Sequence, residues 1–366
     1  MRKLDAQAIK DMALGASLLG TGGGGDPYVG KLMALQAIKN HGPVTMIDVD
    51  EVPDDAFVVP TAMMGAPTVL IEKIANGSEF KRGFEAMEKY FGKKIYATMP
   101  IEAGGVNSML PLAVAAQMQV PIIDADGMGR AFPELQMVTY HLHGITSGPM
   151  VVTDEKGNVA VLDTISNQWS ENIARAMTVA QGGSVMICIY PMTGKDIKAC
   201  GIRDIMTYSE EIGKAIRQSN QYDIPPVKQL LDKINGYELF RGKITDVLRE
   251  TRGGFNFGTV KLDGLEAYKG ENCEVGFQNE NLVVNKNDQV LATTPDLICL
   301  VDIENITPIT TDALEYGRRV LVIGIKCDPK WRTQKGIETV GPRYFGYDMD
   351  YLPIEERMKG VKQDGI

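Results

Sequence analysis

The chain has 366 residues, which exceeds the size at which a single core usually keeps growing, so two domains are expected. Hydrophobic residues make up 44% of the chain and charged residues 23%, a composition typical of a folded protein and not of a disordered one. The net charge of −9 argues against nucleic acid and anionic membrane as main partners, because both require a basic face.

The cysteines and the lengths of the apolar runs indicate the cellular compartment of the protein. The five cysteines form no C-x-x-C pair and are odd in number, as expected for reduced thiols in a cytosolic protein. The first residues lead into a polar segment without the apolar stretch of a secretory signal. No apolar run approaches the ~18 residues of a membrane span. The sequence therefore predicts a cytoplasmic protein without a membrane segment.

Helical and strand patterns alternate through the first part of the chain. Residues 5–19 carry apolar residues at helical spacing, with Asp5 as N-cap, and the run TGGGGDP ends this helix. Asp26 and Pro27 then begin a second helix as N-cap and first-turn residue. Strands are expected at 44–49, 57–63, 95–98 and 120–123, with helices at 80–91 and 108–118 between them. This order predicts an α/β domain over residues 1–165 with a largely parallel sheet.

The pattern changes after a hairpin expected at residues 150–163. Helices are expected at 169–180, 204–219 and 227–234, with a strand at 185–190. Between about 237 and 328 only short β-type runs remain, separated by Gly, Asn and Asp turns. We therefore predict a C-terminal domain over residues 166–366 that begins with a helical connection and is then mainly β, as a sandwich or a barrel.

Polar side chains follow the ends of the strands predicted in the α/β domain. Ligands of open parallel sheets bind outside the carboxyl ends of the strands, so Glu102, Asn107, Asp124, Asp126 and Arg130 are expected to share one rim. Carboxylates, an amide and a guanidinium suit acid/base chemistry on a small polar molecule. The structural alternatives are a turn at Asp126, a helix cap at Asn107 and an ion pair at Arg130.

Four consecutive glycines, Gly22, Gly23, Gly24 and Gly25, precede Asp26 in the loop between the first two helices. The loop lacks the GK[ST] of a phosphate loop and the order of a dinucleotide-binding fingerprint. Its glycines nevertheless allow backbone N–H groups to approach a ligand closely, and the start of the next helix favours an anion. The sequence therefore predicts substrate binding here, and a flexible hinge is the alternative.

The segment VPIIDADG resembles the strand and D-x-D-G that open haloacid-dehalogenase-type phosphatases. That resemblance implies Mg²⁺-dependent phosphoryl transfer with Asp124 as nucleophile and Asp126 as acid/base. In that family the motif normally opens the fold, whereas here it follows β-α units, and no clear downstream acidic pair or companion Lys motif follows it. Phosphoryl transfer therefore stays an alternative.

Histidines offer the main signal for a metal. In the run YHLHG, His141 and His143 lie two positions apart, and together with Glu134 or Asp126 they could hold Zn²⁺. Such a pair is more often structural. We therefore expect no metal and no other cofactor, and if a metal is bound we expect it at His141 and His143.

Several strings together resemble the S-methyl-thiohydantoin desulfurase family, long known only as a domain of unknown function and often found beside hydantoinase/oxoprolinase proteins. In the first half they are LGTGGGGDP (Leu19 to Pro27), EAGGVNS (Glu102 to Ser108) and DADGMGRAFPE (Asp124 to Glu134). In the second half they are IARAMTVAQGG (Ile173 to Gly183), FQNENL (Phe277 to Leu282), PDLI (Pro295 to Ile298) and GPRYFGYD (Gly341 to Asp348). The resemblance covers nearly the whole chain.

The resemblance implies an α/β domain joined to a mainly β domain. It also implies an enzyme that removes a methylthio group from an S-methylated thiohydantoin by hydrolysis, giving a hydantoin and methanethiol. A hydantoinase/oxoprolinase protein is the partner it suggests, and assembly into a homo-oligomer is left open. The alternative within the same setting is a non-catalytic ligand-binding or accessory subunit of a hydantoinase.

Roles for the candidate residues follow from this reaction. Asp126 or Glu102 activates water for attack on the carbon bonded to sulfur, and the other carboxyl, or Asp124, protonates a ring nitrogen. Asn107 and the glycine-loop N–H groups hold the ring oxygen. Arg130 binds an acidic substituent, and Glu134 is placed with the substrate-binding residues. The string FQNE, with Asn279 and Glu280, caps the cleft from the β domain, unless it is only a turn between strands.

Overall fold

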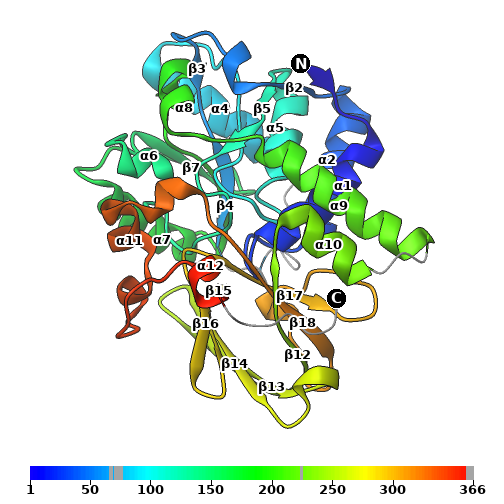
Figure 1. Ribbon diagram of the computed structural model, residues 1–366. Helices are drawn as coiled ribbons and strands as arrows, with labels where there is room; N and C mark the ends of the chain where they lie inside the picture. Colours follow the sequence, from blue (N-terminus) through cyan, green and yellow to red (C-terminus); the bar gives the residue numbers. More distant parts are fainter. Residues whose placement is uncertain (66–68, 70–76, 223–225, 360–366) are drawn as a thin grey trace.

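The computed structural model describes residues 1–65, 69, 77–222 and 226–359. The chain forms two parts (Figure 1). The α/β body comprises residues 1–234, and the β domain comprises residues 237–325. The segment after the β domain returns to the junction, where the buried Trp331 packs edge-on against Phe132.

Helices cover the α/β body and begin where the sequence predicts caps. The side chain of Asp5 accepts a hydrogen bond from the backbone of Ala8 and starts α1, and Asp26 does the same for α2 through the N–H of Tyr28. The helices of this body are α1 (Ala6–Leu19), α2 (Pro27–His41), α4 (Ser78–Phe91), α5 (Leu110–Met118), α6 (Thr139–Leu142), α7 (Asn167–Ala180), α8 (Gly194–Cys200), α9 (Ile205–Tyr222) and α10 (Pro226–Ile234). The last segment adds α11 (Gln334–Val340) and α12 (Ile354–Arg357).

The sheets of the α/β body are mixed. Strands β2 (Thr45–Ile47) and β5 (Ile122–Ile123) pair in parallel, and β1 (Arg2–Lys3) joins β2 antiparallel. Isolated parallel bridges extend this arrangement between Thr98 and Ile122, Val58 and Ala97, and Thr61 and Pro100. Parallel pairing is therefore present between these predicted strands, although apart from one ladder it consists of isolated bridges.

The prediction of a largely parallel sheet is confirmed only in part. A second sheet has the order β4-β9-β7-β8 and is antiparallel throughout. Its strands are β4 (Thr61–Gly65), β7 (Met150–Thr153), β8 (Val159–Leu162) and β9 (Ser184–Cys188). The predicted hairpin makes β7 and β8 antiparallel, and β9 then enters between β4 and β7. Short strands β3 (Phe57–Val58), β6 (Ala125–Asp126), β10 (Met192–Thr193) and β11 (Ile202–Arg203) form two-stranded pairs.

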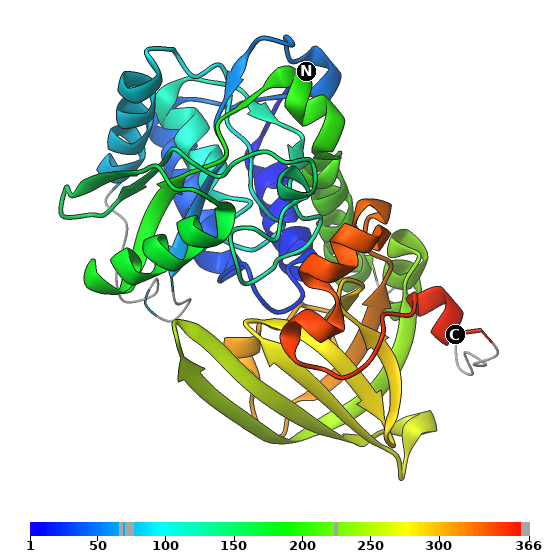
Figure 2. The ribbon, with the colours of Figure 1, turned by 90° about the vertical axis from the view of Figure 1, so that its left-hand side faces the viewer.

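The β domain is one seven-stranded antiparallel sheet of order β16-β15-β14-β13-β12-β18-β17. Its strands are β12 (Tyr237–Arg252), β13 (Phe255–Gly264), β14 (Asn272–Gln278), β15 (Glu280–Lys286), β16 (Gln289–Thr293), β17 (Leu297–Asp302) and β18 (Arg319–Ile325). The sheet curls until edge strand β17 also packs against β15, which makes a half-barrel. The predicted mainly β domain is therefore confirmed, and of the two predicted forms, sandwich or barrel, the sheet has part of the barrel form. The tip of the long β12–β13 hairpin reaches the α/β body near α7 (Figure 2).

A buried arginine fastens the two parts together. Within the α/β body, Arg130 donates to the hydroxyl of Thr21 at 2.9 Å. Across the junction it donates to the carbonyls of Asn281, Pro295 and Asp296 at 2.9–3.1 Å. A guanidinium is buried without large cost only when its donors are satisfied. None of the helices in the described ranges is both long and apolar enough to cross a bilayer.

Candidate active site

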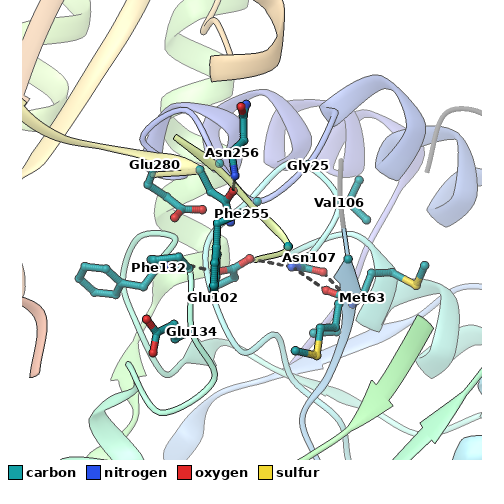
Figure 3. A pocket seen from close by; sticks show the side chains of 18 of the residues that line it. Gly25, Met63, Glu102, Val106, Asn107, Phe132, Glu134, Phe255, Asn256 and Glu280 are labelled. Carbon is teal, nitrogen blue, oxygen red and sulfur yellow. Dashed lines mark hydrogen bonds between the residues drawn. The ribbon is translucent and has the colours of Figure 1, made fainter. Parts of the chain in front are cut away.

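A cavity of about 360 Å³ lies between the α/β body and the β domain. Each part supplies one wall. The body contributes Gly22–Gly25, Ala62–Gly65, Ile101, Glu102, Val106, Asn107, Met128, Phe132–Leu135, Arg175 and Ile187. The β domain contributes Arg249, Thr251, Gly254–Asn256, Asn279, Glu280, Thr311 and Asp312. The cavity is therefore formed only where the two parts meet, and Figure 3 shows it at close range.

The glycine loop forms one side of this pocket. Gly24 has φ +73°, a backbone conformation that other residues adopt only with strain, and a Cβ there would lie 2.4 Å from the Cα of Gly104. The carbonyl of Gly22 accepts the N–H of Thr311 from the β domain at 2.8 Å. Within the described residues, the N–H groups of Gly24 and Gly25 donate no hydrogen bond. The loop is thus held from both parts and leaves donors at the pocket wall.

Glu102 is the carboxyl that the α/β body contributes to the pocket. One carboxylate oxygen accepts from the Asn107 side-chain amide at 2.6 Å, and the other accepts from the N–H of Phe132 at 3.3 Å (Figure 3). Asn107 is fixed in turn, since its oxygen accepts from the N–H of Met63 at 2.9 Å. Burial raises the pKa of Glu102 to about 7, although both hydrogen bonds act to lower it. Glu102 is therefore poised to exchange a proton near neutral pH.

Glu280 brings a second carboxyl from the first residue of β15. Its carboxyl packs against the glycine loop, because a Cβ built on Gly23 would lie 1.9 Å from one of its oxygens. The other oxygen, Oε2, is buried and has no hydrogen-bond partner among the described residues. Burial, reinforced by the nearby charge of Glu102, raises the pKa of Glu280 well above its ordinary value. Two neighbouring carboxylates repel each other because both are negative, so one of the two carboxyls is held protonated.

The hairpin tip closes one end of the pocket. Arg175 from α7 is ion-paired with Glu171 and donates to the carbonyl of Pro133 at 3.1 Å. Its guanidinium also lies 4.2 Å from the ring centre of Phe255, at the hairpin tip. Glu134 lies nearby, where it accepts the hydroxyl of Tyr344 at 2.9 Å.

Of the residues predicted for the site, the four glycines, Glu102, Asn107 and Glu134 line the pocket. The structure places Asp124 elsewhere. Its carboxylate accepts the N–H groups of Met206 and Thr207 at 2.9 and 3.1 Å, which caps the start of α9. A short hydrogen bond from the Thr207 hydroxyl occupies its second oxygen. The carboxylate is therefore used in joining α9 to the strand end.

Asp126, Arg130 and Asp26 also lie outside the pocket lining. The Oδ1 of Asp126 accepts the N–H groups of Met128 and Gly129, which is the turn that the sequence left as an alternative. Burial raises the pKa of Asp126 well above its usual range. The guanidinium of Arg130 donates its hydrogen bonds at the domain junction, and Asp26 caps α2. Phosphoryl transfer through DADG therefore has no support from this geometry, since neither Asp faces the cavity.

The histidine pair is not arranged as a metal centre. His141 contacts the Asn167 amide through Nδ1 at 3.0 Å, and neither it nor His143 lines the pocket. No group of three or more His, Cys, Asp or Glu in the described part of the chain is placed to hold a metal ion.

Some pocket residues carried little or no sequence signal. Arg175 and Phe255 reach the site through the packing of α7 on the hairpin tip, which no local pattern specifies. Glu280 was expected only to cap the cleft or form a turn. The sequence feature that pointed to this turn was Asn279, because asparagine readily adopts the left-handed conformation. In the structure Asn279 has a φ of +57° and lies in the turn into β15.

The fold and the site together describe a two-domain protein with a carboxyl-lined pocket between an α/β body and a half-barrel. Comparison of the sequence with known protein families identifies the family. Residues 7–164 match the S-Me-THD-like, N-terminal domain, and residues 165–354 match the S-Me-THD-like, C-terminal domain. The chain therefore belongs to the S-Me-THD-like family. No curated protein matches it significantly.

The fold is also similar to that of a solved structure. An X-ray structure of a protein from Chromobacterium violaceum superposes with a TM-score of 0.81 at 22% sequence identity. The superposition covers 97% of this chain and 100% of that chain. At this identity the likeness shows the two-domain fold alone.

Proposed function

We propose that the protein hydrolyses S-methyl-thiohydantoin-type heterocycles, releasing methanethiol and a hydantoin. The observation that carries this proposal is the pair of buried carboxyls, Glu102 and Glu280, which the two domains bring to one pocket beside a loop with spare N–H donors. Membership of the S-Me-THD-like family supports the substrate class.

The first step is attack of water on the ring carbon that carries sulfur. Glu102 is the base: its carboxylate takes a proton from water as the oxygen bonds to the carbon. Its hydrogen bonds from Asn107 and the Phe132 N–H orient the carboxylate for this task. Such a positioned base contributes roughly 10²–10⁴ to a rate. Asn107 is thus a positioning residue, and its amide is not free to hold the ring oxygen as the sequence suggested.

The second step is proton delivery and loss of the thiol. Glu280, kept protonated by burial and by the charge of Glu102, gives its proton to the ring nitrogen as the carbon becomes tetrahedral. The carbon–sulfur bond then breaks with its electron pair on sulfur, and methanethiolate takes the proton that Glu102 received. The new hydroxyl loses its proton to Glu280 and becomes the carbonyl of the hydantoin, so both carboxyls return to their starting states.

The glycine loop assists by stabilising charge. Attack at the carbon between two nitrogens pushes negative charge onto the neighbouring ring carbonyl. The N–H groups of Gly24 and Gly25 are donors available at the wall for that oxygen. Preorganised donors of this kind are often the largest contribution to catalysis.

The test is to incubate the protein with 2-methylthio-imidazol-4-one while assaying free thiol, with the plain hydantoin as a control. A double variant, Glu102→Gln with Glu280→Gln, controls for contaminating activity. We expect thiol release by the wild-type protein that the double variant lacks. Equal release by both proteins contradicts the proposal. Binding measured by calorimetry without turnover instead favours an accessory subunit of a hydantoinase.

A further inference from the structure

We propose that the same pocket also hydrolyses cyclic acylguanidines in which an imino or amino group replaces the methylthio group, releasing ammonia in place of a thiol. The substrate class is the 2-iminoimidazolidin-4-ones. The inference rests on the proposed function, because it uses the same attack by water on the same ring carbon. What it adds is a second leaving group.

The leaving group decides how many protons the site must supply. Methanethiol is a far stronger acid than ammonia, so a thiolate departs without first being protonated. An amine departs only after its nitrogen has accepted a proton. A pocket serving thiolate alone needs a base and one proton for the ring nitrogen. This pocket places Glu134 at its wall in addition to Glu102 and Glu280, and Oε2 of Glu280 has no partner within the described residues.

The charges around the cavity also suit a cyclic acylguanidine. In a 2-iminoimidazolidin-4-one the ring carbon bears three nitrogens, so the group is an acylguanidine with several N–H donors, and carboxylates accept hydrogen bonds from such donors. The lining includes Glu102, Glu134, Glu280 and Asp312. The cations at the wall are already engaged: Arg175 with Glu171 and the Pro133 carbonyl, and Arg249 with the carbonyls of Thr311 and Leu314. The pocket therefore favours a neutral or cationic ring.

The reaction balances with the groups present. Glu102 takes a proton from water as its oxygen bonds to the ring carbon, and Glu280 gives its proton to the exocyclic nitrogen. Glu102 then passes the proton from water to the same nitrogen. The carbon–nitrogen bond breaks with its electron pair on nitrogen, and ammonia leaves. The hydroxyl proton returns to Glu280 as the carbonyl forms, so no oxidant or reductant takes part.

The experiment compares two products from two substrates. The wild-type protein is incubated with 2-iminoimidazolidin-4-one under an ammonia assay, and with 2-methylthio-imidazol-4-one under a thiol assay. We expect both products. Glu280→Gln should lower ammonia release by a further factor of roughly 10²–10⁴ beyond its effect on thiol release, because only the amine must be protonated to leave. The control is Asp124→Asn, which alters a carboxyl that does not line the pocket and should leave the ratio of the two rates unchanged.

Each outcome decides the matter. Thiol release without ammonia release overturns this inference and leaves the proposed function standing. Ammonia release whose ratio to thiol release is the same in Glu280→Gln overturns the assigned proton donor and with it the inference. Ammonia release without thiol release overturns the proposed function instead. The absence of both products from folded wild-type protein overturns both.

Discussion

Two pairs of acidic residues lie at the ends of strands or at turns, and only one pair lines the pocket. Asp124 and Asp126 lie beside β5 and accept backbone N–H groups from the turns and helix that follow them. Glu102 and Glu280 come from different domains and face one cavity, which neither aspartate lines. Among the described residues, a buried carboxyl oxygen without a partner occurs in both pairs, as Oδ2 of Asp126 and Oε2 of Glu280. The difference shows that an acidic motif after a strand is not a site in itself. A carboxylate that is held by backbone N–H groups away from a cavity stabilises the fold, whereas one that lines a cavity can act on a ligand.

The strongest test of this difference is Glu102→Gln. The change conserves volume and can keep a hydrogen bond to the Phe132 N–H, so the fold should persist. We expect turnover of a methylthio heterocycle to fall by roughly 10²–10⁴, because the base that activates water is lost. Thiol release and a thermal melt on the same sample measure both effects. Full turnover in a folded variant would place the base elsewhere.

The pH dependence of stability sharpens the comparison. The pKa of Glu102 is raised from 4.5 to about 7 in the folded protein, so folding disfavours its ionised form. Its contribution is therefore fully present below pH 4.5 and is lost as the pH rises through 7, by on the order of 3 kcal/mol. Urea unfolding at pH 5 and pH 8 should show a smaller decline for Glu102→Gln than for wild type. Parallel declines would mean that Glu102 does not titrate in this range.

Gly23→Ala tests the contact between Glu280 and the loop. The added Cβ would overlap the Glu280 carboxyl, which must move. We expect turnover to fall, with a stability loss of about 1–3 kcal/mol. Gly42→Ala is a control for backbone strain without a clash, since Gly42, unlike Gly23, has a positive φ, and nothing lies within 4 Å of its Cβ position. A larger loss of turnover in Gly42→Ala would contradict the assigned contact.

The smallest expected effect on turnover is that of a change in the pair Asp124 and Asp126. Asp124→Ala removes the acceptor at the start of α9 and should cost about 1 kcal/mol of stability. Turnover by the folded fraction should be unchanged, because the side chain does not line the pocket. Comparing the melting temperature with the rate per folded molecule checks this. A large fall in that rate would erase the distinction between the two pairs.

The sequence predicts local structure better than it predicts the site. Caps at Asp5 and Asp26 depend on neighbouring residues only, so the patterns that predict them are confirmed. Glu102 was placed in the pocket by its position after a strand. Asp126 occupies a similar position, and only the folded structure, in which Glu102 lines the pocket and Asp126 does not, separates the two. Glu280 and Arg175 join the site through contacts between distant segments, which no spacing encodes.

The hydrogen bonds of Arg130 across the domain junction couple the unfolding of the two domains. Its donors reach Thr21 in the body and three carbonyls in the second half of the chain. Pulling the halves apart would leave a buried guanidinium without acceptors, a loss typically of 3–5 kcal/mol when a buried charge loses its partners. We therefore expect the two domains to unfold together in one cooperative transition. Replacing either domain by an unrelated one would also require new hydrogen-bond acceptors for the buried Arg130.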